Sequence, residues 1–171
     1  MAYNKERYRT PKMMAYYMLL GIWYLLSLLP LCVHYLLSDL LYVIVYLLIG
    51  YRKEVVRSNL KTSFPGKTDK ELLQIEKRFY HFLGDYLAES VKLMSISRKN
   101  LKKRIVFKGT ELVDKCINEE QSCAVFLGHY CNWEWITSLP LWVTPKAQCG
   151  QIYHPLENTV FDLVFLRLRQ R

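Results

Sequence analysis

His129 and Glu134 are the two residues of this chain whose types and spacing could together move a proton. His129 follows Gly128 directly, at the end of an apolar run formed by residues 122–127. A short, partly β-branched run that ends at a glycine predicts a buried strand. A carboxylate that holds one imidazole nitrogen leaves the other nitrogen free to act as a base. The pair is therefore a candidate proton-handling site.

The spacing of His129 and Glu134 requires a turn between them. On one continuous helix the two residues would lie about 140° apart and could not meet. Asn132 is a favourable N-cap for a short helix at residues 133–139, whose positive end would help to keep Glu134 ionised. We therefore expect His129 in the turn and Glu134 in the first helical turn, where the backbone can bring them together. A His-x4-Glu match also arises by chance, with the histidine then serving only as a structural residue.

Helix and strand patterns alternate along the chain after a long helix that begins near residue 68. Thr68 and Glu71 have the spacing of a capping box, and apolar residues then recur at helical spacing to about residue 95. Alternating strands and helices predict a parallel sheet, and ligands of such sheets bind at the carboxyl ends of the strands. The chain order is a strand at residues 104–108, a helix at 110–118, a strand at 122–127, a strand at 147–153 and a helix at 157–171. We expect an α/β fold, in which N-terminal membrane-associated helices precede the first part of a mainly parallel sheet flanked by helices.

Residues 13–51 contain no Lys or Arg, and their only formal charge is Asp39. About 20 apolar helical residues cross a bilayer core, and Pro30 divides the segment. Residues 13–29 are the better candidate for a span. Residues 36–51 fit a second span, a re-entrant segment or a helix lying at the interface. The segment is too long for a secretory signal and lacks its cleavage site, and it is too apolar for the buried hairpin of a soluble protein.

Basic residues lie on both sides of this apolar segment. Positively charged residues that flank a membrane segment tend to stay in the cytoplasm, so cations on both sides favour a hairpin or a shallow anchor over one crossing. The same cations would attract anionic headgroups. The chain has a formal net charge of +9 but no aromatic–basic module, so nucleic acid is not an expected partner. The flanking cations are Lys5, Arg7, Arg9 and Lys12 before the segment and Arg52, Lys53, Arg57 and Lys61 after it.

The five cysteines contain no Cys-x-x-Cys pair, so they predict neither a disulfide framework nor a zinc site. Cys131 lies two positions from His129. It is either a thiol nucleophile or, as we favour, a small apolar filler of the turn. We expect no metal and no other cofactor.

Residues 128–134, Gly-His-Tyr-Cys-Asn-Trp-Glu, resemble the first signature block of the bacterial lipid A biosynthesis acyltransferases. That family belongs to the wider His-x4-Asp/Glu lysophospholipid acyltransferase group. The resemblance runs from about residue 28 to the last residue, and it implies a membrane anchor at residues 1–51 and the N-terminal portion of an acyltransferase domain at residues 52–171. The further similar blocks, in the family's order, are residues 51–60, 63–65, 84–89 and 152–158.

In that family a lipid hydroxyl attacks the thioester of an acyl carrier. The resemblance implies an O-acyltransferase of lipid A and lipopolysaccharide biosynthesis, with His129 as general base and Glu134 as the residue that orients it. The implied donor is an acyl carrier protein thioester or coenzyme A thioester, and the implied acceptor is a phosphorylated glycolipid. The implied location is the bacterial inner membrane, with the active site facing the cytoplasm. The implied substrate-binding residues are Asn132, His154, Arg167, Arg169 and Arg171.

Two departures from the family pattern leave alternatives open. His154 stands where the family more often has Arg, and it is either a phosphate or carboxylate contact or a turn residue before Pro155. The arginines of residues 167–171 either form forked hydrogen bonds to phosphate or lie on a solvated helix face. The chain also stops within a predicted helix, where the family continues, so we expect weak or absent activity from these 171 residues alone. An acyltransferase acting on another membrane lipid and a truncated, non-catalytic membrane remnant are the alternative functions.

Overall fold

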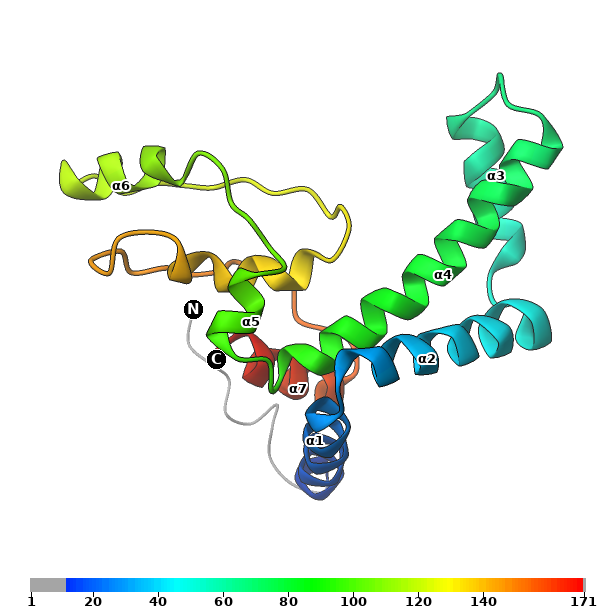
Figure 1. Ribbon diagram of the computed structural model, residues 1–171, viewed down its shortest axis with the longest axis horizontal. Coiled ribbons are helices and arrows are strands. Elements are labelled where there is room, and N and C mark those ends of the chain that lie inside the picture. Colours follow the sequence, from blue (N-terminus) through cyan, green and yellow to red (C-terminus); the bar gives the residue numbers. More distant parts are fainter. Residues whose placement is uncertain (1–11, 171) are drawn as a thin grey trace. The chain divides into compact units, whose positions relative to one another are not determined.

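The computed structural model describes residues 12–170, and every regular element in that range is a helix (Figure 1). The helices divide between two compact units. Of the described residues, the hairpin unit contains residues 29–92, and the site unit contains residues 12–28 and 93–170. The helices are α1 (Lys12–Leu28), α2 (Leu31–Tyr42), the π-helix η2 (Val43–Ile49), α3 (Lys53–Ser63), α4 (Asp69–Leu93), α5 (Arg98–Lys102), α6 (Thr110–Asn118), the 3-10 helix η3 (Trp133–Leu141) and α7 (Thr159–Arg169).

The expected α/β fold is wrong, because no strand occurs between residues 12 and 170. The three segments predicted as strands, residues 104–108, 122–127 and 147–153, are irregular. Their apolar side chains are largely uncovered, and Phe126 is 94% exposed. A strand needs a neighbour that pairs with its backbone and a layer that covers its apolar face. The described chain provides these segments with neither, so the apolar pattern alone does not produce a sheet.

The capping box predicted before the long amphipathic helix is confirmed. The backbone N–H of Thr68 donates to Glu71 Oε2 at 2.9 Å, and the N–H of Glu71 donates to Thr68 Oγ1 at 3.4 Å. The backbone and hydroxyl hydrogen bonds from Thr68, followed by the charge of Lys67, lower the pKa of the Glu71 carboxyl. These reciprocal bonds satisfy N–H groups that the first helical turn leaves unpaired. The helix predicted at residues 110–118 is also confirmed, as α6.

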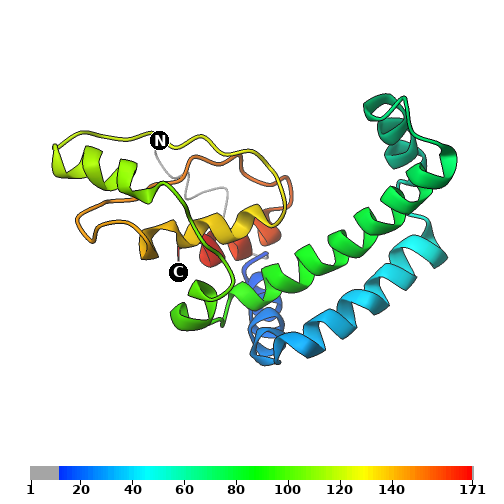
Figure 2. The same cartoon turned by 45° about the horizontal axis from the view of Figure 1, so that its top comes forward.

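In the hairpin unit, α2 and η2 run alongside α4 (Figures 1 and 2). Polar side chains join the two partners along their length. The hydroxyl of Tyr35 donates to Glu89 Oε1 at 3.0 Å, and the hydroxyl of Ser38 donates to Asp85 Oδ1 at 2.6 Å. Gly84 permits the close approach, because a Cβ there would lie 2.7 Å from Ser38 Oγ and 2.9 Å from the Ser38 carbonyl oxygen. A glycine is therefore required at this crossing.

An ion pair between a buried carboxylate and a half-exposed arginine closes the other end of the hairpin unit. Glu76 is buried, and Arg57 donates to it from Nε at 2.8 Å and from Nη2 at 3.1 Å. Burial opposes ionisation of Glu76, but the hydrogen bonds from Arg57 and Tyr46 and the charges of Arg57 and Lys53 together outweigh it and lower the pKa of this carboxyl. Nearby, the hydroxyl of Tyr80 donates to the carbonyl oxygen of Tyr51 at 2.5 Å. α3 is thus tied to α4 through charge and hydrogen bonds rather than through an apolar core.

One helical stretch of the described residues, Leu31–Ile49, is long and apolar enough by length and composition to cross a membrane. It comprises α2 and η2, has 19 residues and begins directly after Pro30. The stretch favoured from the sequence, residues 13–29, corresponds to α1, which is apolar but shorter. Pro30 separates the two because a proline in a helix interior removes a hydrogen bond and clashes with the preceding turn.

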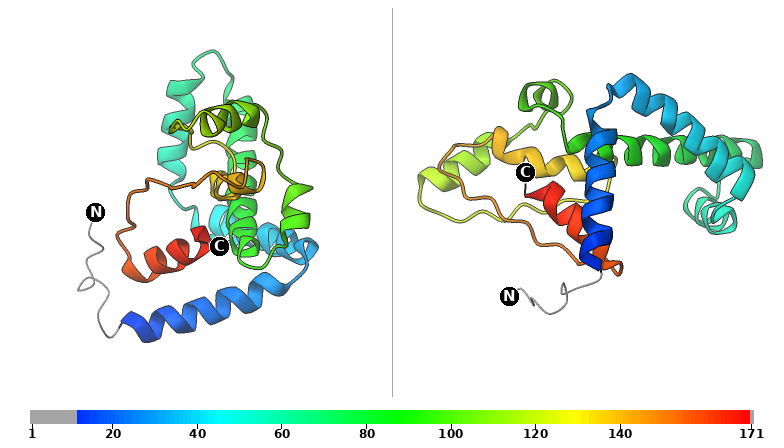
Figure 3. Two further views of the ribbon diagram at one scale, coloured as in Figure 1. Left: turned by 90° about the vertical axis from the view of Figure 1, so that its left-hand side faces the viewer. Right: turned by 90° about the horizontal axis from the view of Figure 1, so that it is seen from below.

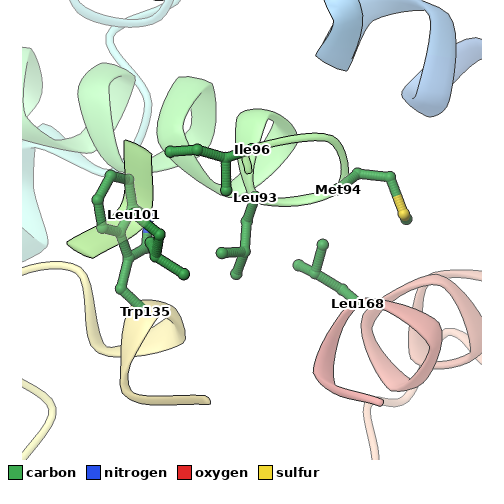
Figure 4. Packing of buried hydrophobic residues seen from close by; sticks show 6 residues of the cluster. All are labelled: Leu93, Met94, Ile96, Leu101, Trp135 and Leu168. Carbon is green, nitrogen blue, oxygen red and sulfur yellow. The ribbon is translucent and has the colours of Figure 1, made fainter. Parts of the chain in front are cut away.

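The core of the site unit is a small cluster of buried apolar side chains, most of them between residues 93 and 101 (Figure 4). α1 and α7 lie side by side in this unit (Figure 3), and the rings of Trp23 and Phe165 meet edge to face at 5.8 Å between centroids. The hydroxyl of Ser95 donates to the carbonyl oxygen of Ser27. This packing anchors η3 and α7, the helices that carry the candidate site residues. The cluster consists of Leu93, Met94, Ile96, Leu101, Trp135 and Leu168.

Candidate functional site

His129 lies on an exposed, irregular segment that leads into η3. The chain turns sharply there. The N–H of Tyr130 donates to the carbonyl oxygen of Gly128 at 2.9 Å, and the N–H of Trp133 donates to that of Cys131 at 3.1 Å. Cys131 has a φ of 52°, a left-handed conformation that is uncommon for a residue with a side chain. The local prediction is confirmed, since His129 precedes η3 and Glu134 lies in the first turn of η3.

The side chains of His129 and Glu134 have different partners. The ring of His129 meets the ring of Trp133 edge to face, with 5.2 Å between centroids. Glu134 is 3% exposed, and its carboxylate receives two hydrogen bonds from Arg169. Within residues 12–170, no hydrogen bond links the imidazole to this carboxylate. The structure therefore brings Glu134 to an arginine, and it places the histidine beside an indole.

The pair of Glu134 and Arg169 has bidentate geometry. Arg169 Nε lies 3.0 Å from Oε2, and Nη2 lies 2.7 Å from Oε1. The guanidinium also lies over the rings of Tyr153 and Phe165, with 5.0 Å and 5.6 Å to their centroids. Two parallel N–H···O bonds to a carboxylate are among the strongest hydrogen bonds in proteins. The pair consequently links η3 to α7 across 35 positions of sequence.

Within the described residues, the other predicted substrate-binding residues lie on separate segments of the chain. Asn132 is half-buried and precedes η3, but its side chain does not form the predicted cap. His154 is exposed, and its Nδ1 lies 2.9 Å from the carbonyl oxygen of Pro155. Arg167 is exposed on α7. Arg171 lies outside the described residues.

Arg167 borders an open groove between α1 and α7, with a volume of about 630 Å³. The walls are mainly apolar, and Gly21 leaves free space, because a Cβ there would meet no atom within 4 Å. An apolar groove with one cation at its edge fits an acyl chain attached to an anionic group. Nothing in the sequence pattern predicts this groove. Its lining residues are Tyr17, Leu20, Gly21, Tyr24, Met94, Arg167 and Gln170.

Sequence reasoning also missed the partnership of Glu134 with Arg169. The sequence pattern pairs Glu134 with the nearest histidine and Arg169 with phosphate. The available signal was the carboxylate itself: it follows an apolar segment and is flanked by two tryptophans, so it was a candidate for burial. A buried carboxylate requires a cation or several donors.

Comparison with known proteins supplies the identity that geometry alone does not. A family model for bacterial lipid A biosynthesis acyltransferases matches residues 1–171, the full length of the sequence. No curated protein and no solved structure is significantly similar to the chain. The family match extends beyond the signature around His129 and includes both units described above. The chain belongs to the bacterial lipid A biosynthesis acyltransferase family.

Proposed function

We propose that this chain transfers a fatty acyl group from an acyl carrier protein thioester to a hydroxyl of a lipid A precursor, with His129 as the general base. The family match carries the proposal. His129 supports it, because the residue is exposed and its ring nitrogens have no hydrogen-bond partner among residues 12–170. Such a nitrogen is available to an incoming hydroxyl.

The proposed step is an acyl exchange between oxygen and sulfur. The hydroxyl oxygen attacks the thioester carbonyl while His129 removes the hydroxyl proton. The tetrahedral intermediate then collapses, the C–S bond breaks, and the leaving thiolate takes the proton from the imidazolium. A positioned base of this kind typically contributes about 10²–10⁴-fold to the rate.

Glu134 has its proposed role of orienting His129 only after its carboxylate leaves Arg169. An acceptor phosphate can cause that exchange, because the guanidinium fork binds phosphate in a bidentate manner as it binds carboxylate. Binding of the phosphorylated acceptor would thus draw Arg169 from Glu134 and release the carboxylate towards the imidazole. In this scheme the ion pair is the resting arrangement of the site.

The groove beside Arg167 is the proposed location of an acceptor acyl chain. Its apolar walls would cover the chain, and the guanidinium of Arg167 would face the anionic part of the lipid. Gly21→Leu should fill the groove and raise the KM for the acceptor, whereas Ile22→Leu, an exposed neighbour that is not part of the lining, should leave KM unchanged. Equal KM values for the two variants would remove the groove from the proposal.

The decisive experiment measures acyl transfer by the full chain in membranes. The substrates are a labelled acyl carrier protein thioester and a phosphorylated, acylated glucosamine disaccharide. His129→Ala should lower the rate by about 10²–10⁴-fold, while Tyr130→Ala, an exposed neighbour in the same segment, should have little effect. A His129→Ala variant with undiminished rate would contradict the base assignment. Parallel assays with acyl coenzyme A and with lysophosphatidic acid separate the donor and acceptor alternatives.

A non-catalytic membrane protein is the second candidate, and one observation favours it. The carboxylate of Glu134 is bound to Arg169 and not to His129, as expected of an ion pair with a purely structural role. The same assay distinguishes the two candidates. A non-catalytic chain transfers no label from either donor to either acceptor, although it remains bound to the membrane.

A further inference from the structure

The helical stretch formed by α2 and η2 has two stripes of side chains on different faces. One stripe is polar or aromatic and turned towards α4. The other is aliphatic and exposed, and its residues recur at intervals of three and four, as residues on one face of a helix do. The stripe towards α4 consists of Tyr35, Ser38, Tyr42 and Tyr46, and the exposed stripe of Leu36, Leu40, Val43 and Leu47.

Each residue of the stripe towards α4 contacts a side chain of that helix. Tyr35 and Ser38 donate to carboxylates of α4. Tyr42 stacks on His81 with 3.6 Å between ring centroids, and Tyr46 lies 4.9 Å from the ring of Tyr80. These contacts hold α2 and η2 against α4, so α4 would have to enter any membrane that the stretch crosses.

α4 cannot enter the hydrocarbon layer. It has charged side chains on several faces, with Lys77 and Arg78 exposed to solvent and Asp85 bonded to α2. Charged groups are costly at the centre of a bilayer unless they face a water-filled cavity or are paired. If α2 and η2 crossed the membrane, they would carry these charges of α4 with them. The composition of the stretch permits a crossing, but its partner helix opposes one.

We infer that α2 and η2 lie flat in the headgroup region of an anionic bilayer, with the aliphatic stripe of Leu36, Leu40, Val43 and Leu47 among the acyl chains and α4 on the aqueous side. A helix with one apolar face and a polar opposite face binds membranes in this way. The charge that follows the stretch fits this partner: residues 52–67 contain five Lys or Arg and one acidic residue. Cations at the headgroup level are attracted to anionic lipids.

The test measures depth along the stripe in the full chain, reconstituted in vesicles of phosphatidylcholine and phosphatidylglycerol. The native cysteines are replaced by serine, and spin labels are attached to Leu36→Cys, Leu40→Cys, Val43→Cys and Leu47→Cys. A flat helix gives four similar, shallow depths. A crossing helix gives depths that rise and then fall, and that result would overturn the inference. Lys77→Cys on α4 is the aqueous control, and its burial in lipid would also overturn the inference.

A second measurement separates the bilayer from a protein partner. Stripe labels covered by a second copy of the chain would be shielded from oxygen in the lipid and would show dipolar coupling to one another, which contradicts a lipid contact. In addition, Leu40→Glu should move the label at position 47 into water, whereas Leu112→Glu, a leucine of similar exposure on α6, should not. Equal effects of these two changes would refute the role of the stripe. Unchanged helicity by circular dichroism shows that the variants remain folded.

Discussion

The hairpin unit and the site unit are stabilised in different ways. In the hairpin unit, residues close in sequence or on two adjacent helices form repeated contacts, such as those from Tyr35 and Ser38 to α4. In the site unit, one buried ion pair joins Glu134 to Arg169, while long irregular segments with exposed apolar side chains flank η3. The first arrangement spreads polar contacts along two helices, whereas the second combines one bidentate pair of low exposure with a small apolar core. The two units should therefore respond differently to single substitutions.

The largest effect is expected from Arg169→Met in the site unit. The change leaves Glu134 buried without its cation, and breaking a buried pair by removing one partner costs about 3–5 kcal/mol. The free energy of unfolding from chemical denaturation measures the loss. The matched change in the hairpin unit, Arg57→Met, should cost less, because the side chain of Arg57 is 52% exposed and water can reach the pair. Equal losses would remove the contrast between the two units.

Gly84→Ala should cause the largest loss within the hairpin unit. The added methyl group would overlap Ser38, so α2 must move away from α4, and overpacking of this kind costs about 1–3 kcal/mol. Gly66→Ala is the control, because a Cβ at Gly66 meets no atom within 4 Å. Thermal unfolding followed by circular dichroism reports both changes. A stabilised Gly84→Ala variant would contradict the close contact of the two helices.

Thr68→Ala tests the start of α4 and should have a smaller effect. The variant loses the hydroxyl of the capping box, and loss of an N-cap side chain costs about 1 kcal/mol. The same replacement at Thr62, whose hydroxyl bonds to the Ser58 carbonyl oxygen within α3, should cost less. Denaturant titration of the two variants compares them directly. A larger loss at Thr62 would show that α4 does not depend on this cap.

The smallest effect is a dependence of stability on acid pH. Because the pKa of Glu76 is lowered in the folded chain, its ionised form stabilises the fold above the pKa of the unfolded chain. That contribution is lost as the pH falls through the lowered pKa, since the carboxylate then gains a proton. Glu76→Gln should flatten the decline of stability as the pH falls below the ordinary pKa of a glutamate side chain. An unchanged pH profile would show that the pair contributes no net stability.

The predictable parts of the fold are those with local causes. Thr68 and Glu71 are close in sequence, so their capping box and the helix behind it could be recognised directly. The turn after Gly128 was also recognised. The sheet was predicted wrongly because residues 122–127 have an apolar pattern typical of strands, and a pattern contains no information about whether a pairing partner exists.

The local positions of His129 and Glu134 at the start of η3 were predictable, but the partner of Glu134 was not. His129 and Glu134 stand out by type and spacing, whereas the partner of Glu134 lies in a helix 35 positions away. Which cation reaches a buried carboxylate depends on how η3 and α7 pack, and short motifs do not contain that information. The roles of His129, Glu134 and the arginines therefore remain predictions that the proposed assays test.

The low exposure of the Glu134–Arg169 pair, with side chains 3% and 17% exposed, has a consequence for behaviour in salt. Mobile ions screen exposed charges over about 8 Å at physiological ionic strength, but they reach buried pairs poorly. The exposed pairs of the hairpin unit, such as Lys67 with Glu71 at 3.6 Å, should weaken as salt is added. The ion pair between η3 and α7 should persist in concentrated sodium chloride. Ionic strength alone should therefore weaken electrostatic contacts in the hairpin unit while the site unit keeps its ion pair.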